Sequence, residues 1–152
     1  MFNTRFTLAI IGGVVLDHWT KFLARAYLSM DSELVLIPKV LSLQLVFNKG
    51  AAYGMFHNYP NLLSAFALTV IVLAFIFQKH FANTVWSKIG LSTIMMGAIG
   101  NVSDRILFAK VTDMFNIHII PVFNVADILI NIGVLCFIID FIVTHNAEKE
   151  RT

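Results

Sequence analysis

Two aspartates, Asp113 and Asp127, are the residues of this sequence best suited to carry chemistry. Two carboxyl groups held close together in a poorly hydrated pocket cannot both ionise, so one keeps a proton. The ionised group can then activate water while the protonated group donates to a developing oxyanion. Alone, Asp127 could help cap a helix after Asn124, and Asp113 could be a loop acid facing solvent. The pair together indicates a site because further polar residues are expected at the same depth.

Several ionisable and amide side chains accompany the two aspartates near one end of the apolar segments. Asp17 and Lys21 stand four residues apart, which places a carboxylate and an ammonium on one face of a helix. Such a pair could simply neutralise itself and stabilise the helix. Ionisable groups next to a bilayer are costly unless they are paired or hydrated, so a cluster of them favours a functional site. The other members expected there are Asn48, Asn101, Arg105 and Asn124.

Two other kinds of catalysis were considered for this cluster. A hydroxyl nucleophile such as Ser103 with Lys21 as its base remains open, although no G-x-S-x-G turn surrounds a candidate serine. The five histidines are dispersed along the chain without an H-E-x-x-H motif, so a metal site is not expected.

The composition indicates which elements must position these residues. Hydrophobic residues make up 58% of the chain and charged residues 13%, too little polar side chain to cover a water-soluble globule. We predict an all-α integral membrane protein with a single domain over residues 1–152. Its four transmembrane helices are expected at residues 6–27, 62–77, 89–108 and 124–143, each near the length that crosses a bilayer.

The segments between these helices suggest the topology. Residues Leu41 to Asn48 alternate in polarity, which predicts a short strand and a small β-containing segment between the first two helices. The segment 109–123 is also expected to be extended, with a partial alternation from Asn116 to Ile120. Lys79 and Lys88 in the middle loop favour cytoplasmic termini and place the polar cluster at the extracytoplasmic face. The basic residues are scattered, which argues against nucleic acid as a partner.

Five sequence blocks resemble the lipoprotein signal peptidase family, also called signal peptidase II. They occur in the family's order and with its approximate spacing across most of the chain. The blocks are Asp17-His-Trp-Thr-Lys21, Asn48-Lys-Gly-Ala-Ala-Tyr-Gly54, Gly100-Asn-Val-Ser-Asp-Arg105, Val111-Thr-Asp113 and Phe123-Asn-Val-Ala-Asp127.

The resemblance implies an aspartic endopeptidase with Asp113 and Asp127 as its catalytic dyad. It implies supporting or substrate-binding roles for Asp17, Lys21, Asn48, Gly50, Gly54, Asn101, Arg105 and Asn124. The implied substrate is a diacylglyceryl-modified prolipoprotein, cut on the N-terminal side of its lipid-modified cysteine in the bacterial cytoplasmic (inner) membrane. Membrane lipid is the other expected partner, and a monomer is the expected functional form.

Two rival functions follow from the same residues. A small carrier or proton-coupled channel would use the acids as an ion relay, but a relay needs polar groups at successive depths. The second apolar segment offers Ser64 and Thr69 as its polar residues, which argues against a relay. A structural subunit would explain small residues such as Gly97 as helix contacts, but would leave the two acids beside Arg105 unexplained.

Overall fold

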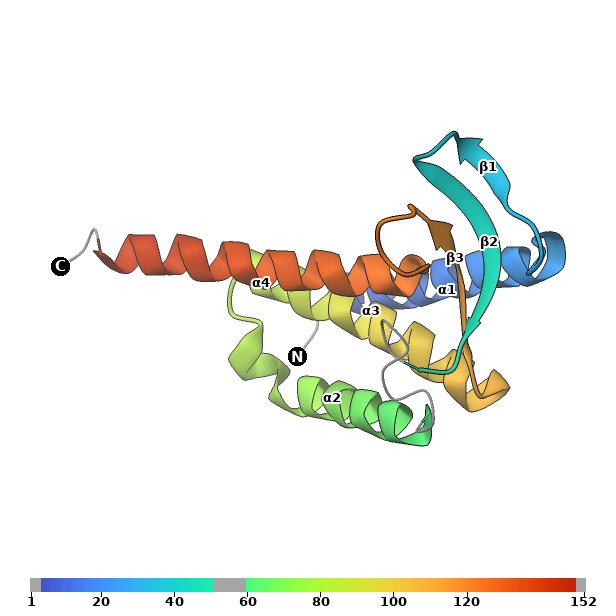
Figure 1. Cartoon of the computed structure of the whole chain (residues 1–152). Coiled ribbons are helices and arrows are strands. Elements are labelled where there is room, and N and C mark those ends of the chain that lie inside the picture. Colours follow the sequence, from blue (N-terminus) through green and yellow to red (C-terminus); the bar gives the residue numbers. More distant parts are fainter. Residues whose placement is uncertain (1–3, 51–59, 150–152) are drawn as a thin grey trace.

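Four long helices and a small sheet make up the computed structural model, which describes residues 4–50 and 60–149. The helices are α1 (Thr4–Tyr27), α2 (Pro60–Phe81), α3 (Val85–Phe108) and α4 (Val125–Lys149). The strands are β1 (Leu34–Ile37), β2 (Leu41–Asn48) and β3 (Val111–Asn116). Figure 1 shows the sheet at the end of the helices where α1 and α3 finish and α4 begins. The chain thereby brings three segments that are distant in sequence to one end of the molecule.

The sheet has the order β1-β2-β3, and both pairings are antiparallel. The predicted strand at Leu41–Asn48 is confirmed and forms the central strand. The prediction missed β1, whose four residues are all apolar and all exposed, so that no alternation marks it. The segment 109–123, predicted to be extended, contains strand β3 from Val111 to Asn116, which ends where the alternation from Asn116 to Ile120 begins. The first four residues of β3 are buried regardless of type, which hides the period of two.

The four predicted helices exist, with ends that extend two to six residues beyond several predicted bounds. Among the described residues, Thr4–Tyr27 and Val125–Ala147 are long and apolar enough to cross a membrane, and Ser64–His80 is a shorter apolar helix. Helix α3 carries the polar residues Asn101, Asp104 and Arg105 near its end. The protein is therefore mostly helical, with two candidate membrane spans established by length and composition.

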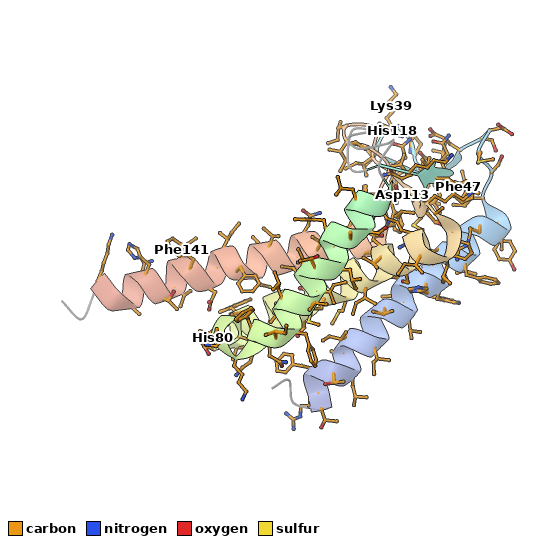
Figure 2. The ribbon with its side chains drawn as sticks, turned by 90° about the horizontal axis from the view of Figure 1, so that it is seen from below. Lys39, Phe47, His80, Asp113, His118 and Phe141 are labelled. Atoms are coloured by element: carbon orange, nitrogen blue, oxygen red, sulfur yellow. The ribbon has the colours of Figure 1, made fainter. Side chains whose placement is uncertain are left out.

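The far end of the helices is held by a different set of contacts. Thr84 caps α3 and shares a reciprocal capping box with Ser87. Thr84 Oγ1 also donates to the carboxylate of Asp140 on α4. Asp140 therefore lies beside the start of α3, at the opposite end of that helix from Asn101, Asp104 and Arg105. In Figure 2, His80 and Phe141 lie at this end, whereas Asp113 and Phe47 lie at the sheet.

Small residues let α3 approach its neighbours closely. A Cβ atom on Gly97 would lie 2.2 Å from the backbone oxygen of Ala126 on α4, and one on Gly100 would lie 2.3 Å from the carboxylate of Asp17 on α1. Gly90 and Gly133 meet in the same way across the α3–α4 interface. Close backbone approach is how apolar helices associate in lipid, where little hydrophobic driving force acts between them.

We expect Gly97→Ala to destabilise the protein by about 1–3 kcal/mol, because the added methyl group must push α3 away from the backbone of α4. Thermal unfolding of the purified protein in detergent measures the loss. The matched control is Gly12→Ala, whose added Cβ meets nothing within 4 Å. Equal melting temperatures for the two variants would contradict the close α3–α4 contact.

Candidate active site

A fully buried ammonium group, that of Lys21, lies beneath the sheet end of the helices. Its Nζ atom lies 2.8 Å from Oδ2 of Asp17 one helical turn earlier and 3.7 Å from Oδ2 of Asp104 on α3. All three side chains are 0% exposed. Nζ also donates to Oδ1 of Asn101 at 2.9 Å. The charge of Lys21 is thus shared between α1 and α3, and the spacing of Asp17 and Lys21 predicted their contact.

The side-chain amide of Asn101 connects Lys21 with the aspartate pair. Because its oxygen accepts from Lys21 and, at 3.1 Å, from the Asn124 amide, the orientation of the group is fixed. Its Nδ2 atom therefore faces Asp127 and donates to Oδ1 at 2.9 Å. Asn124 Nδ2 in turn donates to Oδ1 of Asp113 at 2.6 Å. A connected polar network leads from the buried cation to both aspartates.

Each aspartate of the pair is held by different donors. Asp113 lies on β3 and accepts from Asn124 and, at 3.2 Å, from Asn48 on β2. Asp127 lies in the first turn of α4, where its Oδ2 accepts from the backbone N–H of Asn124 at 3.1 Å. In turn, Oδ1 of Asn124 accepts from the backbone N–H of Asp127 at 3.0 Å, which completes a reciprocal cap. N–H donors at a helix N-terminus stabilise negative charge on Asp127.

The electrostatic environment of Asp113 differs from that of an ordinary surface carboxyl. Burial and then the nearby charge of Asp127 raise the pKa of Asp113 from 3.8 to about 7. The hydrogen bonds from Asn48 and Asn124 and the charge of Lys21 oppose that rise in pKa. Near neutral pH the Asp113 carboxyl is therefore poised to hold a proton beside its partner.

Both aspartates line one cavity of about 570 Å³. Asn48, Gly50, Asn101 and Arg105 share its polar wall with them. Apolar side chains from three helices and the segment before α4 line the rest, among them Phe66, Val70, Ile94, Ala98, Ile130 and Phe123. The cavity therefore joins an acid pair to an apolar groove, an arrangement that suits a substrate with a polar reacting bond and apolar flanks.

The sequence model of the signal peptidase (SPase) II family matches residues 9–143. The chain belongs to this family. A lipoprotein signal peptidase of Gloeobacter violaceus is 37% identical over 90% of this chain and 81% of its own length. One from Enterococcus faecalis is 34% identical over 90% of this chain and 87% of the relative. This membership makes the chain a peptidase.

Solved structures share the fold of this signal peptidase II family member. One bacterial membrane enzyme, solved by the in meso method at 2.3 Å, superposes with a TM-score of 0.88 over 98% of this chain and 94% of its own. A second, solved at 1.9 Å, gives a TM-score of 0.81 over 92% and 94%. Both are 24% identical in sequence, so they establish the fold alone.

The structure brings nearly all the predicted site residues of this family member together. Asp17, Lys21, Asn101, Asn124, Asp113, Asp127 and Asn48 form one hydrogen-bonded network. Gly50 donates its N–H to Asn48 Oδ1 at 2.9 Å, and its carbonyl accepts from Arg105 at 3.1 Å. Gly54 lies outside the described residues. Which of these residues act on substrate remains a prediction.

Three further residues join the network that were not among the predicted site residues. They are Arg25, Asp104 and Thr112, which contact one another behind β3. Arg25 stands four residues after Lys21 and eight after Asp17, so the same helix face continues for another turn. That repeat was the available signal for Arg25, whereas no local pattern connects it with Thr112, 87 residues later.

We expect Lys21→Met to destabilise the protein by about 3–5 kcal/mol, because Asp17 would lose its buried cationic partner and Asp104 would keep only Arg25. Denaturation of the purified protein in detergent measures the change, with the exposed Lys79→Met as the control. Adding Asp17→Asn to Lys21→Met should recover part of the loss. A Lys21→Met variant as stable as Lys79→Met would contradict the role of the buried cation.

Proposed function

We propose that Asp113 and Asp127 form the catalytic dyad with which this peptidase removes signal peptides from prolipoproteins. The observation that supports the proposal is the pair of carboxyl groups lining one cavity, joined through the amides of Asn101 and Asn124. The alternative of a serine with Lys21 as base is less well supported, because the Lys21 ammonium is engaged by Asp17 and Asn101. Family membership and the site chemistry therefore agree on an aspartic mechanism.

The contacts of the two acids support different roles in peptide hydrolysis. Asp127, with its N–H donors, is the ionised base that takes a proton from water as the water oxygen attacks the scissile carbonyl. Asp113, whose pKa is raised to about 7, holds the proton and donates to the developing oxyanion. The proton taken by Asp127 then passes to the leaving nitrogen as the C–N bond breaks. As the carbonyl re-forms, the tetrahedral intermediate returns its proton to Asp113, so the pair is again in its one-proton state.

The cavity supports a substrate that enters sideways from lipid. Its apolar wall includes Phe66 and Val70 of α2, Ile94 and Ala98 of α3, and Ile130 of α4. An apolar signal-peptide segment and the acyl chains of a diacylglyceryl-modified cysteine suit such a wall, and the bond on the N-terminal side of that cysteine would then meet the dyad. Arg105 and Gly50, held together at the polar rim, are placed to bind the substrate backbone.

The proposed membrane arrangement has all four helices as spans of a single domain over residues 1–152. The sheet and the dyad would lie near the extracytoplasmic face of the bacterial cytoplasmic (inner) membrane, with both termini in the cytoplasm. Lys79 and Lys88, at the end away from the sheet, support this orientation. The proposed enzyme works as a monomer without a cofactor, and its partners are the lipid-modified substrate and membrane lipid.

Substituting either acid of the dyad should abolish cleavage of a diacylglyceryl-modified prolipoprotein. We expect Asp113→Asn and Asp127→Asn each to lower kcat/KM by about 10²–10⁴-fold, because each removes one partner in proton transfer. Asp140→Asn, at the far end of α4, is the matched control and should keep wild-type turnover.

These assays use purified full-length protein with matched melting temperatures, and EDTA should leave wild-type cleavage unchanged. Full activity in either dyad variant would contradict the aspartic mechanism. Ion flux through proteoliposomes without any cleavage would favour the carrier.

The pH dependence of kcat/KM should report the loss of the proton from Asp113. Because its pKa is raised to about 7, Asp113 keeps its proton below that pH and loses it above. With the oxyanion donor lost, kcat/KM should fall as pH rises through about 7. Steady-state cleavage between pH 5 and 9 measures the profile, and a flat alkaline side would contradict the assignment of the proton to Asp113.

A further inference from the structure

Thr112 immediately precedes Asp113 on β3, and its side chain leaves the opposite face of the strand. Thr112 is 1% exposed and pairs across the sheet with Phe47. Contacts that hold Thr112 against α1 and α3 therefore also determine the position of the β3 backbone at Asp113. The position of Asp113 relative to the helices thus depends on the contacts of its neighbour.

The backbone N–H and the hydroxyl of Thr112 are each bound by a charged side chain. Its backbone N–H donates to Oδ2 of Asp104 on α3 at 2.9 Å, and its hydroxyl accepts from Nη1 of Arg25 on α1 at 2.8 Å. Arg25 Nη1 also lies 3.4 Å from Oδ1 of Asp104, which closes a triangle of contacts. The Arg25 guanidinium stacks 4.7 Å from the ring centroid of Phe108, which restricts it further.

The same acid connects this triangle with the network beneath the dyad. Asp104 Oδ2 lies 3.7 Å from Lys21 Nζ, and Lys21 donates to Asn101, the amide that holds Asp127. Asp104 therefore contacts two groups that bear on the dyad. One is Lys21, which orients the Asn101 amide bound to Asp127. The other is the backbone N–H of Thr112, the residue before Asp113. Neither Arg25 nor Asp104 lines the cavity, so their effect on the reaction must pass through other residues.

We propose that Arg25, Asp104 and Thr112 form a clamp that sets the distance between Asp113 and Asp127, as positioning residues that touch no substrate. The proposal rests on the dyad assigned above. A misplacement of about 1 Å at a reacting group can cost about 10²-fold in rate, so a loosened clamp would act on turnover. Substrate binding, which the cavity wall determines, would be left nearly unchanged.

The test compares variants of the full-length enzyme in detergent on a diacylglyceryl-modified prolipoprotein. Thr112→Val removes the hydroxyl and keeps the shape, and we expect kcat to fall by about 10- to 100-fold with KM within about twofold. Thr112→Ser restores the hydroxyl and should recover most of the turnover. Thr69→Val, whose hydroxyl donates to a carbonyl of its own helix, is the matched control and should behave as wild type.

A double-mutant cycle separates the clamp from a general loss of stability. Arg25→Met and Thr112→Val remove the same contact, so the double variant should lose no more turnover than the worse single variant. The proposal would be overturned by additive losses in kcat or by wild-type turnover in Thr112→Val. It would also be overturned by a Thr112→Ser variant as slow as Thr112→Val, or by a rise in KM alone. Asp113→Asn is measured in the same series to distinguish a failure of the clamp from a failure of the dyad. Full activity in Asp113→Asn would refute the dyad itself.

Discussion

The buried ammonium of Lys21 is the contact on which the polar interior of this protein depends. Lys21 contacts both Asp17 and Asp104, whose side chains are 0% exposed, and Arg25 provides Asp104 with a second cationic contact. Together with the Asn124 amide, Lys21 also fixes the Asn101 amide, so that the nitrogen of Asn101 faces Asp127. The close approach of α1 and α3, with Gly100 against the Asp17 carboxylate, makes these contacts geometrically possible.

Above this cation, the two aspartates differ because they come from different elements. Asp127 lies in the first turn of a helix and accepts from a backbone N–H and from the Asn101 amide, whereas Asp113 comes from a buried strand and accepts from the amides of Asn48 and Asn124. The two carboxyl groups are chemically identical, but the strand and the helix N-terminus place them in different surroundings. Such a difference is what allows one carboxyl group to act as the acid and the other as the base. The sheet also places Asp113 at the cavity wall.

Much of this arrangement follows from the sequence because its signals are local. The four-residue spacing of Asp17 and Lys21 predicted their ion pair, and the apolar runs predicted four helices in nearly correct positions. Strand β1 was missed because apolar residues on both faces leave no alternation. The contact of Arg25 with Thr112 was missed because it depends on tertiary packing. The family blocks predicted which residues would gather, but not which amide would meet which acid.

The most direct test of the account is infrared spectroscopy of the purified enzyme as a function of pH, comparing wild type with Asp113→Asn. A protonated carboxyl group gives a C=O band that disappears when the group ionises. The account predicts a band that is lost as pH rises through about 7 and is missing from Asp113→Asn. Identical spectra for the two proteins between pH 5 and 8 would contradict a proton held on Asp113 and, with it, the proposed division of roles.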